Sequence, residues 1–146
     1  MDIRNMLLDD YEEVYALWMS CAGMGLNDLD DSRDGIGKFL RRNPDTCFVA
    51  EGDGGIVGAI IAGNDGRRGY LYHTAVDLRY RGQGIGGRLV DAALQALEQN
   101  GINKAALVVF ARNESGNRFW EGRGFTVRED LVYRNKTIRE MVRIDT

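Results

Sequence analysis

The middle of the chain reads AVDLRYRGQGIGG over residues 75–87, and four of its last six residues are glycine. An apolar stripe at helical spacing follows, formed by Ile85, Leu89, Ala93 and Leu97. Glycines let backbone N–H groups approach an anion closely, and the N-terminus of a helix adds partial positive charge. The stretch therefore predicts an anion-binding loop or, alternatively, a glycine-rich turn that packs a strand tightly against a helix.

Two other phosphate-binding motifs do not fit this loop. Residues 82–87 match G-x-G-x-x-G, but a dinucleotide-binding turn leaves the first strand directly and needs an acid about 20 residues later. Here the loop lies mid-chain, and the next apolar stretch ends at Phe110 without a carboxylate. A P-loop needs Lys followed by Ser or Thr, where this chain has Arg88 and Leu89.

Outward from the loop, apolar periodicity and turn residues predict one continuous domain over residues 1–146. A strand, a helix and a strand in succession imply a parallel pair, and the hairpins around them imply antiparallel pairs. The predicted fold class is therefore α+β, with a mixed, mostly antiparallel central sheet and helices on both faces. Strands are expected at residues 3–6, 47–50, 56–62, 70–76, 105–110, 125–132 and 138–144, and helices at 10–21, 32–42, 85–99 and 115–121.

The composition is that of a soluble globular domain. Of 146 residues, 44% are hydrophobic and 28% charged. No apolar run approaches the roughly 18 residues of a membrane helix, and the first residues lack the pattern of a signal peptide. Two cysteines and one histidine, far apart in sequence, argue against a zinc site and for reduced thiols. We therefore expect a cytoplasmic protein without a metal or a membrane partner.

The charge is unevenly divided along the chain. Residues 1–65 carry 13 acids and 5 bases, and residues 66–146 carry 9 acids and 14 bases. Most of the bases are arginine, whose guanidinium group matches phosphate geometry. The second half is suited to hold an anion and the first half to tolerate a cation, unless the asymmetry is only a solvated surface.

Residues 75–86 resemble the acetyl-CoA-binding motif of the GCN5-related N-acetyltransferases (GNAT), [RQ]-x-x-G-x-[GA] after a strand ending in Val-Asp. Arg81, Gly84 and Gly86 fill its defining positions. A second stretch, NESGNRFWEGRGF over residues 113–125, is similar to the family's Asn-x-x-(small)-x-x-Phe-Tyr-Glu-x-x-Gly-Phe. The resemblance covers almost the whole chain. It implies an acetyl-CoA-dependent N-acetyltransferase that moves an acetyl group to a primary amine by direct attack in a ternary complex.

The resemblance also implies how acetyl-CoA binds. In this family the strands matching residues 70–76 and 105–110 splay apart and leave a slot for the thioester, while one strand pairs with the pantetheine arm. The N–H groups of the glycine loop hold the pyrophosphate, and Asn113 binds near the thioester, although it is also suited to cap a helix. The implied cofactor-binding residues are Thr74, Ala75, Val76, Arg81, Gly82, Gln83, Gly84, Ile85, Gly86, Gly87, Arg88, Asn113 and Trp120.

The chain departs from the family pattern at the groups that move protons. Trp120 stands where many members have a tyrosine acid, so it closes the slot or packs in the core. Tyr72 and Val108 stand at the two positions where members often place a glutamate base. We expect Tyr72 or His73 to line the acceptor slot as catalytic residues, with a water chain as an alternative. Strand alternation points His73 away from Tyr72 unless a bulge rotates it.

In this family the first two helices and their connection help to form the acceptor pocket. Here the connection carries Asp28, Asp30 and Asp31. These carboxylates predict a small cationic amine or a basic peptide end as the acceptor. As an alternative, they serve as helix caps and solvated surface.

Two other function classes are alternatives to an enzyme. A CoA-binding sensor or interaction module without catalysis is the main rival, because Trp120 and Tyr72 replace the usual acid and base. Nucleic-acid binding is disfavoured by the net charge of −3 and by the lack of an aromatic and basic platform. Family members often dimerise, and the late strands are candidates to pair across an interface, so the resemblance implies a homodimer.

Overall fold

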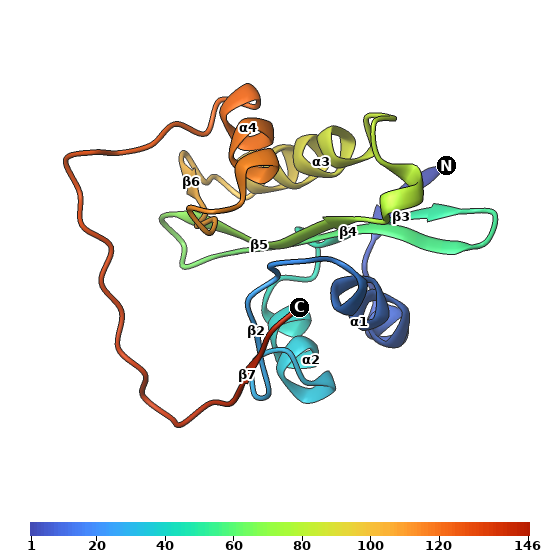
Figure 1. Cartoon of the computed structure of the whole chain (residues 1–146), viewed down its shortest axis with the longest axis horizontal. Coiled ribbons are helices and arrows are strands. Elements are labelled where there is room, and N and C mark those ends of the chain that lie inside the picture. The colour runs from blue at the N-terminus through green and yellow to red at the C-terminus, as the bar shows by residue number, and fades with distance from the viewer.

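The computed structural model describes residues 1–146 as a central sheet with helices on both faces (Figure 1). The sheet order is β1-β3-β4-β5-β6. Only the β5–β6 pair is parallel, and the others are antiparallel. This confirms the mixed, mostly antiparallel sheet. Its strands are β1 (Asp2–Asn5), β3 (Phe48–Gly52), β4 (Gly55–Asn64), β5 (Gly69–Val76) and β6 (Ala105–Ala106).

Two helices cover each face of the sheet (Figure 1). One face carries α1 (Tyr11–Ser20) and α2 (Arg33–Arg42), and the other carries α3 (Ile85–Gln99) and α4 (Glu114–Gly122). Short 3₁₀ turns, η1 (Leu8–Asp10) and η2 (Leu78–Tyr80), precede α1 and the glycine loop. None of these helices is long and apolar enough to cross a membrane.

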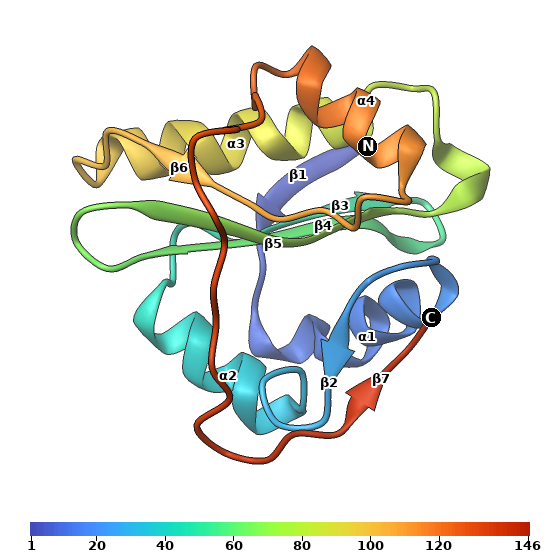
Figure 2. The same cartoon turned by 60° about the vertical axis from the view of Figure 1, so that its left-hand side comes forward.

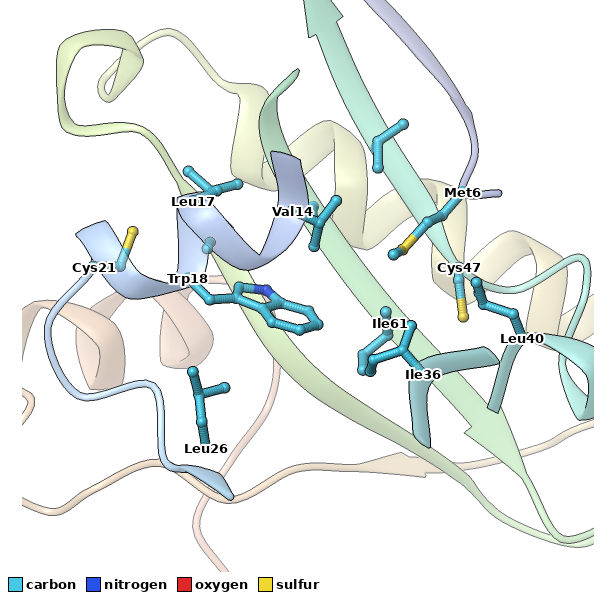
Figure 3. Close-up of a cluster of buried hydrophobic side chains, with 13 residues drawn as sticks. Met6, Val14, Leu17, Trp18, Cys21, Leu26, Ile36, Leu40, Cys47 and Ile61 are labelled. Carbon is cyan, nitrogen blue, oxygen red and sulfur yellow. The ribbon is translucent and has the colours of Figure 1, made fainter. Parts of the chain in front are cut away.

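The sheet separates two buried clusters of apolar side chains. On the α1 and α2 side, 13 residues pack around the indole of Trp18 (Figure 3). On the other side, 11 residues pack under α3, where Leu89 and Leu97 belong to the predicted stripe. Along β4, Ala59 and Ile61 join the first cluster while Ile60 and Ala62 join the second. The central strand is therefore buried on both faces, which explains its continuous apolar run.

A β-bulge interrupts β5 at His73. Ala75 pairs with Ala59 and Tyr72 pairs with Ile61, so His73 and Thr74 together oppose one residue of β4. His73 has a φ of 46°, and it is the only residue other than glycine with a positive φ. The bulge breaks strand alternation, and this is the condition under which the sequence allowed His73 to reach the same cleft as Tyr72.

The parallel pairing of β5 with β6 is short. They pair only at Gly69 with Ala105 and Tyr70 with Ala106. The strand expected at residues 105–110 therefore ends at Ala106. Beyond Tyr70, β5 has no strand partner on this side, and the two segments diverge as the family resemblance implied.

The two expected C-terminal strands are wrong in extent and place. Residues 125–132 form no strand, and of residues 138–144 only β7 (Arg143–Ile144) does. β7 pairs with β2 (Leu26–Asn27) in a separate two-stranded sheet. The chain after α4 leaves the central sheet and crosses to the α2 side before reaching β7 (Figures 1 and 2).

The physical reason is the lack of a pairing partner. A strand exists only where a neighbour satisfies its backbone groups, and residues 126–141 make no backbone–backbone hydrogen bond. Three consecutive charged residues, 128–130, also interrupt the apolar alternation. The apolar side chains of this segment remain exposed, with Val127 at 75% and Ile138 at 96%.

Candidate active site

One cleft of about 1170 Å³ brings the two sequence motifs together with the loop before α2. Its walls are β5, the glycine loop, residues 107–110, the start of α4, the segment after α1 and one side of α2. The glycine loop forms one end, which we call the cofactor end. The other end, which we call the acceptor end, has side chains of α2 and the loop before it beside Tyr72 and His73.

The backbone of the glycine loop is free to donate hydrogen bonds at the cofactor end. No protein group accepts a hydrogen bond from the N–H groups of residues 82–87. Gly82 and Gly84 have φ values of 78° and 81°, and a Cβ atom at either would meet nothing within 4 Å. The Gly84 carbonyl accepts from Arg88 to open α3, so the free N–H groups lie at the positive end of its dipole.

The other glycines of the loop serve packing. A Cβ atom at Gly86 would meet the Phe119 ring at 3.3 Å, and one at Gly87 would meet the Arg123 guanidinium at 2.9 Å. The loop thus combines the two arrangements that the sequence left open. Gly82 and Gly84 expose backbone donors to open space, and Gly86 lets α4 approach α3.

The arginines near the loop are used differently from one another. Arg81 lines the cleft, and its Nε donates to the carbonyl of Val76 at 3.0 Å. Arg79 is paired with Asp77 at 2.9 Å, and this contact lowers the pKa of the Asp77 carboxyl to about 2. Arg88 and Gln83 lie outside the cleft lining. Of the predicted cofactor residues, these last two are the ones that the structure does not bring to the cleft.

The second motif forms the opposite wall of the cofactor end. Asn113 lines the cleft and caps α4, because its Oδ1 accepts from the Gly116 N–H at 3.0 Å. Its amide nitrogen has no protein partner. A Cβ atom at Gly116 would meet Asn113 at 2.5 Å, which explains the small residue in the motif. Trp120 lines the cleft and also packs on Phe119 and Phe125, so its ring lies both at the cleft and against other aromatic side chains.

His73 meets a carboxylate at the acceptor end. Its Nε2 lies 2.7 Å from Oδ1 of Asp31, and their side chains are 13% and 3% exposed. Trp18 donates from Nε1 to the carbonyl of His73 at 3.2 Å and packs edge-on against the imidazole. Asp31 is therefore engaged by a residue of the same chain.

Aromatic side chains form a wall beside His73. Tyr72 packs on Tyr70 at 4.7 Å and on Phe39 at 5.9 Å between ring centroids. Burial raises the pKa of Tyr72 and of Tyr70 above the ordinary value. Tyr72 consequently stays a protonated phenol at neutral pH, which suits a hydrogen-bond donor better than a base.

The three predicted acceptor carboxylates have separate surroundings. Asp30 lines the cleft and accepts from the Asn27 amide at 3.0 Å. Asp28 lies outside the lining, and its Oδ1 accepts from the Val142 N–H. Asp30 is therefore the carboxylate of the three that remains open to a ligand in the cleft.

Sequence reasoning missed part of the acceptor end. The polar side of α2 contributes Lys38 and Arg42, one helical turn apart, and Phe39 lies between them. The apolar stripe of this helix predicts only its buried face and does not indicate which polar residues face the cleft. Their spacing of four residues was the available signal, since it places them on one helix face.

Comparisons with known proteins show the family of the chain. The family model described as "Acetyltransferase (GNAT) family" matches residues 11–125. An acetyltransferase of Sodalis glossinidius is 33% identical over 140 residues, covering 96% of this chain and 97% of its own. An acetyltransferase of Photorhabdus laumondii is 37% identical over 115 residues, covering 79% of each chain.

Solved structures share the fold. Ard1 of Thermoplasma volcanium superposes with a TM-score of 0.77 and 25% identity, covering 87% of this chain and 83% of its own. The PaiA N-acetyltransferase of Thermoplasma acidophilum, solved in complex with coenzyme A, has a TM-score of 0.76 and 19% identity. The superposition covers 88% of this chain and 91% of the PaiA chain.

Proposed function

The chain belongs to the acetyltransferase (GNAT) family, and from this premise we propose that it transfers the acetyl group of acetyl-CoA to a primary amine by direct attack in a ternary complex. The observation that carries the proposal is the row of free N–H groups at residues 82–87, in a loop whose glycines line the same cleft as the bulged strand. When bound, acetyl-CoA supplies an activated acetyl thioester. A relative of similar fold carries coenzyme A.

The residues of the cofactor end fit this ligand. Backbone N–H groups at the start of a helix suit a pyrophosphate, and open space at Gly82 and Gly84 leaves room for it. On the side away from β4, β5 has no strand partner at Thr74, Ala75 and Val76, so an extended pantetheine arm can pair with it there. The free Asn113 amide and the Trp120 ring would lie along the same ligand.

The acceptor is proposed to be a small cationic amine or the amine of a peptide. Asp30 supports this assignment, because its carboxylate lines the cleft without a cationic partner. Asp28 and Asp31, expected to share the role, bind Val142 and His73 instead. We therefore assign the attraction of a cation to Asp30. A screen in which only neutral or acidic acceptors are acetylated would contradict this assignment.

A direct assay tests the function. The purified protein is offered acetyl-CoA with a panel of polyamines, aminoglycosides and peptides, and free CoA is measured with a thiol reagent. We expect CoA release that depends on the amine, and mass spectrometry should show an acceptor heavier by one acetyl group. Binding of acetyl-CoA without turnover across the panel would favour the rival, a CoA sensor, which the absence of a tyrosine at Trp120 supports.

The cell compartment and assembly belong to the same proposal. Cys21 and Cys47 are free and buried, as in a reducing cytoplasm. Exposed apolar side chains along residues 127–142 and the diverging segment 107–110 offer a surface for a second copy. We therefore propose a cytoplasmic homodimer. Light scattering after size exclusion should give twice the mass of the chain, and the mass of one chain would contradict it.

A further inference from the structure

We infer that Asp31 is a positioning residue for His73: it holds the proton of the neutral imidazole on Nε2, so that Nδ1 is the base that accepts a proton from the acceptor amine. The inference rests on the acetyl transfer proposed above. His73 rather than Tyr72 is then the general base, and Asp31 has a role other than binding the acceptor.

The carboxylate of Asp31 is fixed from its own loop. Its Oδ2 accepts from the Asn27 N–H at 2.8 Å, which leaves Oδ1 for Nε2 of His73. The Tyr11 hydroxyl donates to the Asp31 carbonyl at 2.7 Å and ties the same residue to α1. Asp31 borders the cleft, but only 3% of its side chain is exposed and both of its carboxylate oxygens already accept hydrogen bonds, so it offers a substrate ammonium group little surface.

Contacts with Trp18 also hold the His73 residue. A φ of 46° is unfavourable for a residue other than glycine, by about 1 kcal/mol. The Trp18 hydrogen bond to the His73 carbonyl and the edge-on indole hold the bulge in this conformation. Strain of this kind persists where surrounding contacts impose it, and it is concentrated at functional sites.

The two ring nitrogens have different surroundings. An ionised carboxylate accepts hydrogen bonds and does not donate them, so the Nε2 beside Asp31 carries the proton. Nδ1 has no protein partner, yet no buried side-chain nitrogen or oxygen in the chain lacks one. Nδ1 must therefore contact solvent, and His73 lines the cleft. This leaves the Nδ1 lone pair accessible from the cleft.

This arrangement gives the proton a destination in the transfer. A neutral amine nitrogen uses its lone pair to form a bond to the acetyl carbon, the carbon–sulfur bond breaks, and the sulfur leaves as a thiolate with the electron pair. The proton lost by the nitrogen passes to Nδ1, directly or through one water, and the positive charge of the ring is stabilised by the Asp31 carboxylate.

The single histidine makes the tautomer directly measurable. In protein labelled with ¹⁵N at histidine, the ring nitrogens are recorded at a pH well above the ordinary imidazole pKa of about 6.5. We expect a protonated Nε2 with a proton signal slowed in solvent exchange, and an unprotonated Nδ1. The protected signal should disappear in Asp31→Asn. A wild-type ring protonated on Nδ1 would overturn the inference without any assay of activity.

Kinetics of the two residues together test whether Asp31 acts through His73. His73→Ala should lower kcat about 100-fold, in the range of general-base catalysis, and Asp31→Asn at least ~10-fold. Both should leave the Kd of acetyl-CoA within about twofold. The double variant should be no slower than His73→Ala alone. Multiplying effects would show that Asp31 acts independently and would overturn the inference.

A matched acid provides the control. Asp34→Asn removes an exposed carboxylate of the first turn of α2, outside the cleft lining, and should leave kcat within about twofold. If wild type turns over but Asp31→Asn keeps its kcat, only the inference fails. If wild type releases no CoA with any acceptor, the proposed function fails, and the base role of His73 fails with it.

Discussion

The two ends of the cleft are built from different parts of the chain. The cofactor end presents backbone: six consecutive residues, 82–87, whose N–H groups have no protein acceptor. The acceptor end presents side chains: Asp31 and His73, 42 residues apart in sequence, meet there, and Phe39 packs beside them on Tyr72. One end is thus a local feature of the sequence, and the other forms only when the fold is complete.

This difference has a chemical consequence. Backbone donors are the same in every residue except proline, so the cofactor end depends on conformation and on the absence of side chains. The acceptor end depends on the identity of particular side chains. Substitutions should therefore separate the two ends: a Cβ atom in the loop should weaken cofactor binding, and a changed polar group near His73 should affect only the acceptor and the rate.

The largest effect on the affinity for acetyl-CoA is expected from a methyl group at the cofactor end. Gly84→Ala should raise the Kd of acetyl-CoA at least ~10-fold, because a positive φ disfavours alanine and the methyl group enters the open space of the loop. Calorimetric titration measures the affinity. Gly66→Ala is the matched control, since Gly66 also has a positive φ, 88°, and open space around it, but lies outside this cleft.

Both alanine variants should lower Tm by similar amounts, because the backbone strain is alike. Only Gly84→Ala should change the Kd. An equal loss of acetyl-CoA affinity in Gly66→Ala would show that affinity follows stability, and the description of the cofactor end would then be wrong.

A moderate effect is expected from charge at the cofactor end. Arg81→Gln should weaken acetyl-CoA binding about five-fold at low salt and less at high salt, because salt screens attraction to a polyanion. Arg79→Gln and Arg88→Gln should have smaller effects, since Arg79 already pairs with Asp77 and Arg88 lies outside the lining. Arg67→Gln, on the turn after β4, is the control and should not change the Kd. If none of the three substitutions changes the Kd of acetyl-CoA, the excess of basic residues in the second half of the chain plays no part in binding the cofactor.

At the acceptor end, the expected change is in KM. Asp30→Asn should raise the KM for a cationic acceptor about three- to ten-fold, because one partly exposed ion pair contributes about 1 kcal/mol. The Kd of acetyl-CoA should not change. A lower KM for the cationic acceptor would show that Lys38 and Arg42, on the same side of the cleft, decide selectivity instead.

The smallest effect lies outside the cleft and tests whether stability alone explains the others. Arg4 binds Asp10 through two contacts of 2.9 Å, and this lowers the pKa of the Asp10 carboxyl. A lowered folded-state pKa adds stability above the unfolded-state pKa of about 3.9, and this stability is lost as pH falls through the folded value. Asp10→Asn should lower the free energy of unfolding by about 1 kcal/mol at pH 7 and less at acid pH. Neither the Kd of acetyl-CoA nor the acceptor KM should change.

The helices and central strands could be predicted from sequence because their patterns are local. The apolar stripe of α3 predicted its buried face, and Ser32 was recognised as the start of α2, where its hydroxyl accepts from the Gly35 N–H. The strand predicted at residues 125–132 is wrong for the opposite reason. An alternating pattern predicts a strand only if a neighbouring strand is available, and availability depends on the whole fold.

The candidate site also contains parts that follow from local sequence patterns and parts that depend on the whole fold. The glycine loop could be found from its spacing as a candidate anion site, and Asn113 from the resemblance of residues 113–125 to the family motif, since each motif is contiguous. The contact of His73 with Asp31 could not, because it requires the bulge in β5 and a loop 42 residues earlier in the chain. The sequence indicated both residues as candidates, but it placed Asp31 against the acceptor and left His73 dependent on a bulge.

The pairing of β2 with β7 has a consequence for the order of folding. Its ladder joins Leu26 to Ile144 and Asn27 to Arg143, residues separated by most of the chain, and hydrogen bonds between Asp28 and Val142 extend the contact. Closing so long a loop is entropically unfavourable, and a sheet of two short strands is marginal by itself. We therefore expect this contact to form after the central sheet and to open before it, as measured by amide hydrogen exchange. The segment that leads to Asp31 would then be the last part of the acceptor end to assemble, and the first to be lost on warming.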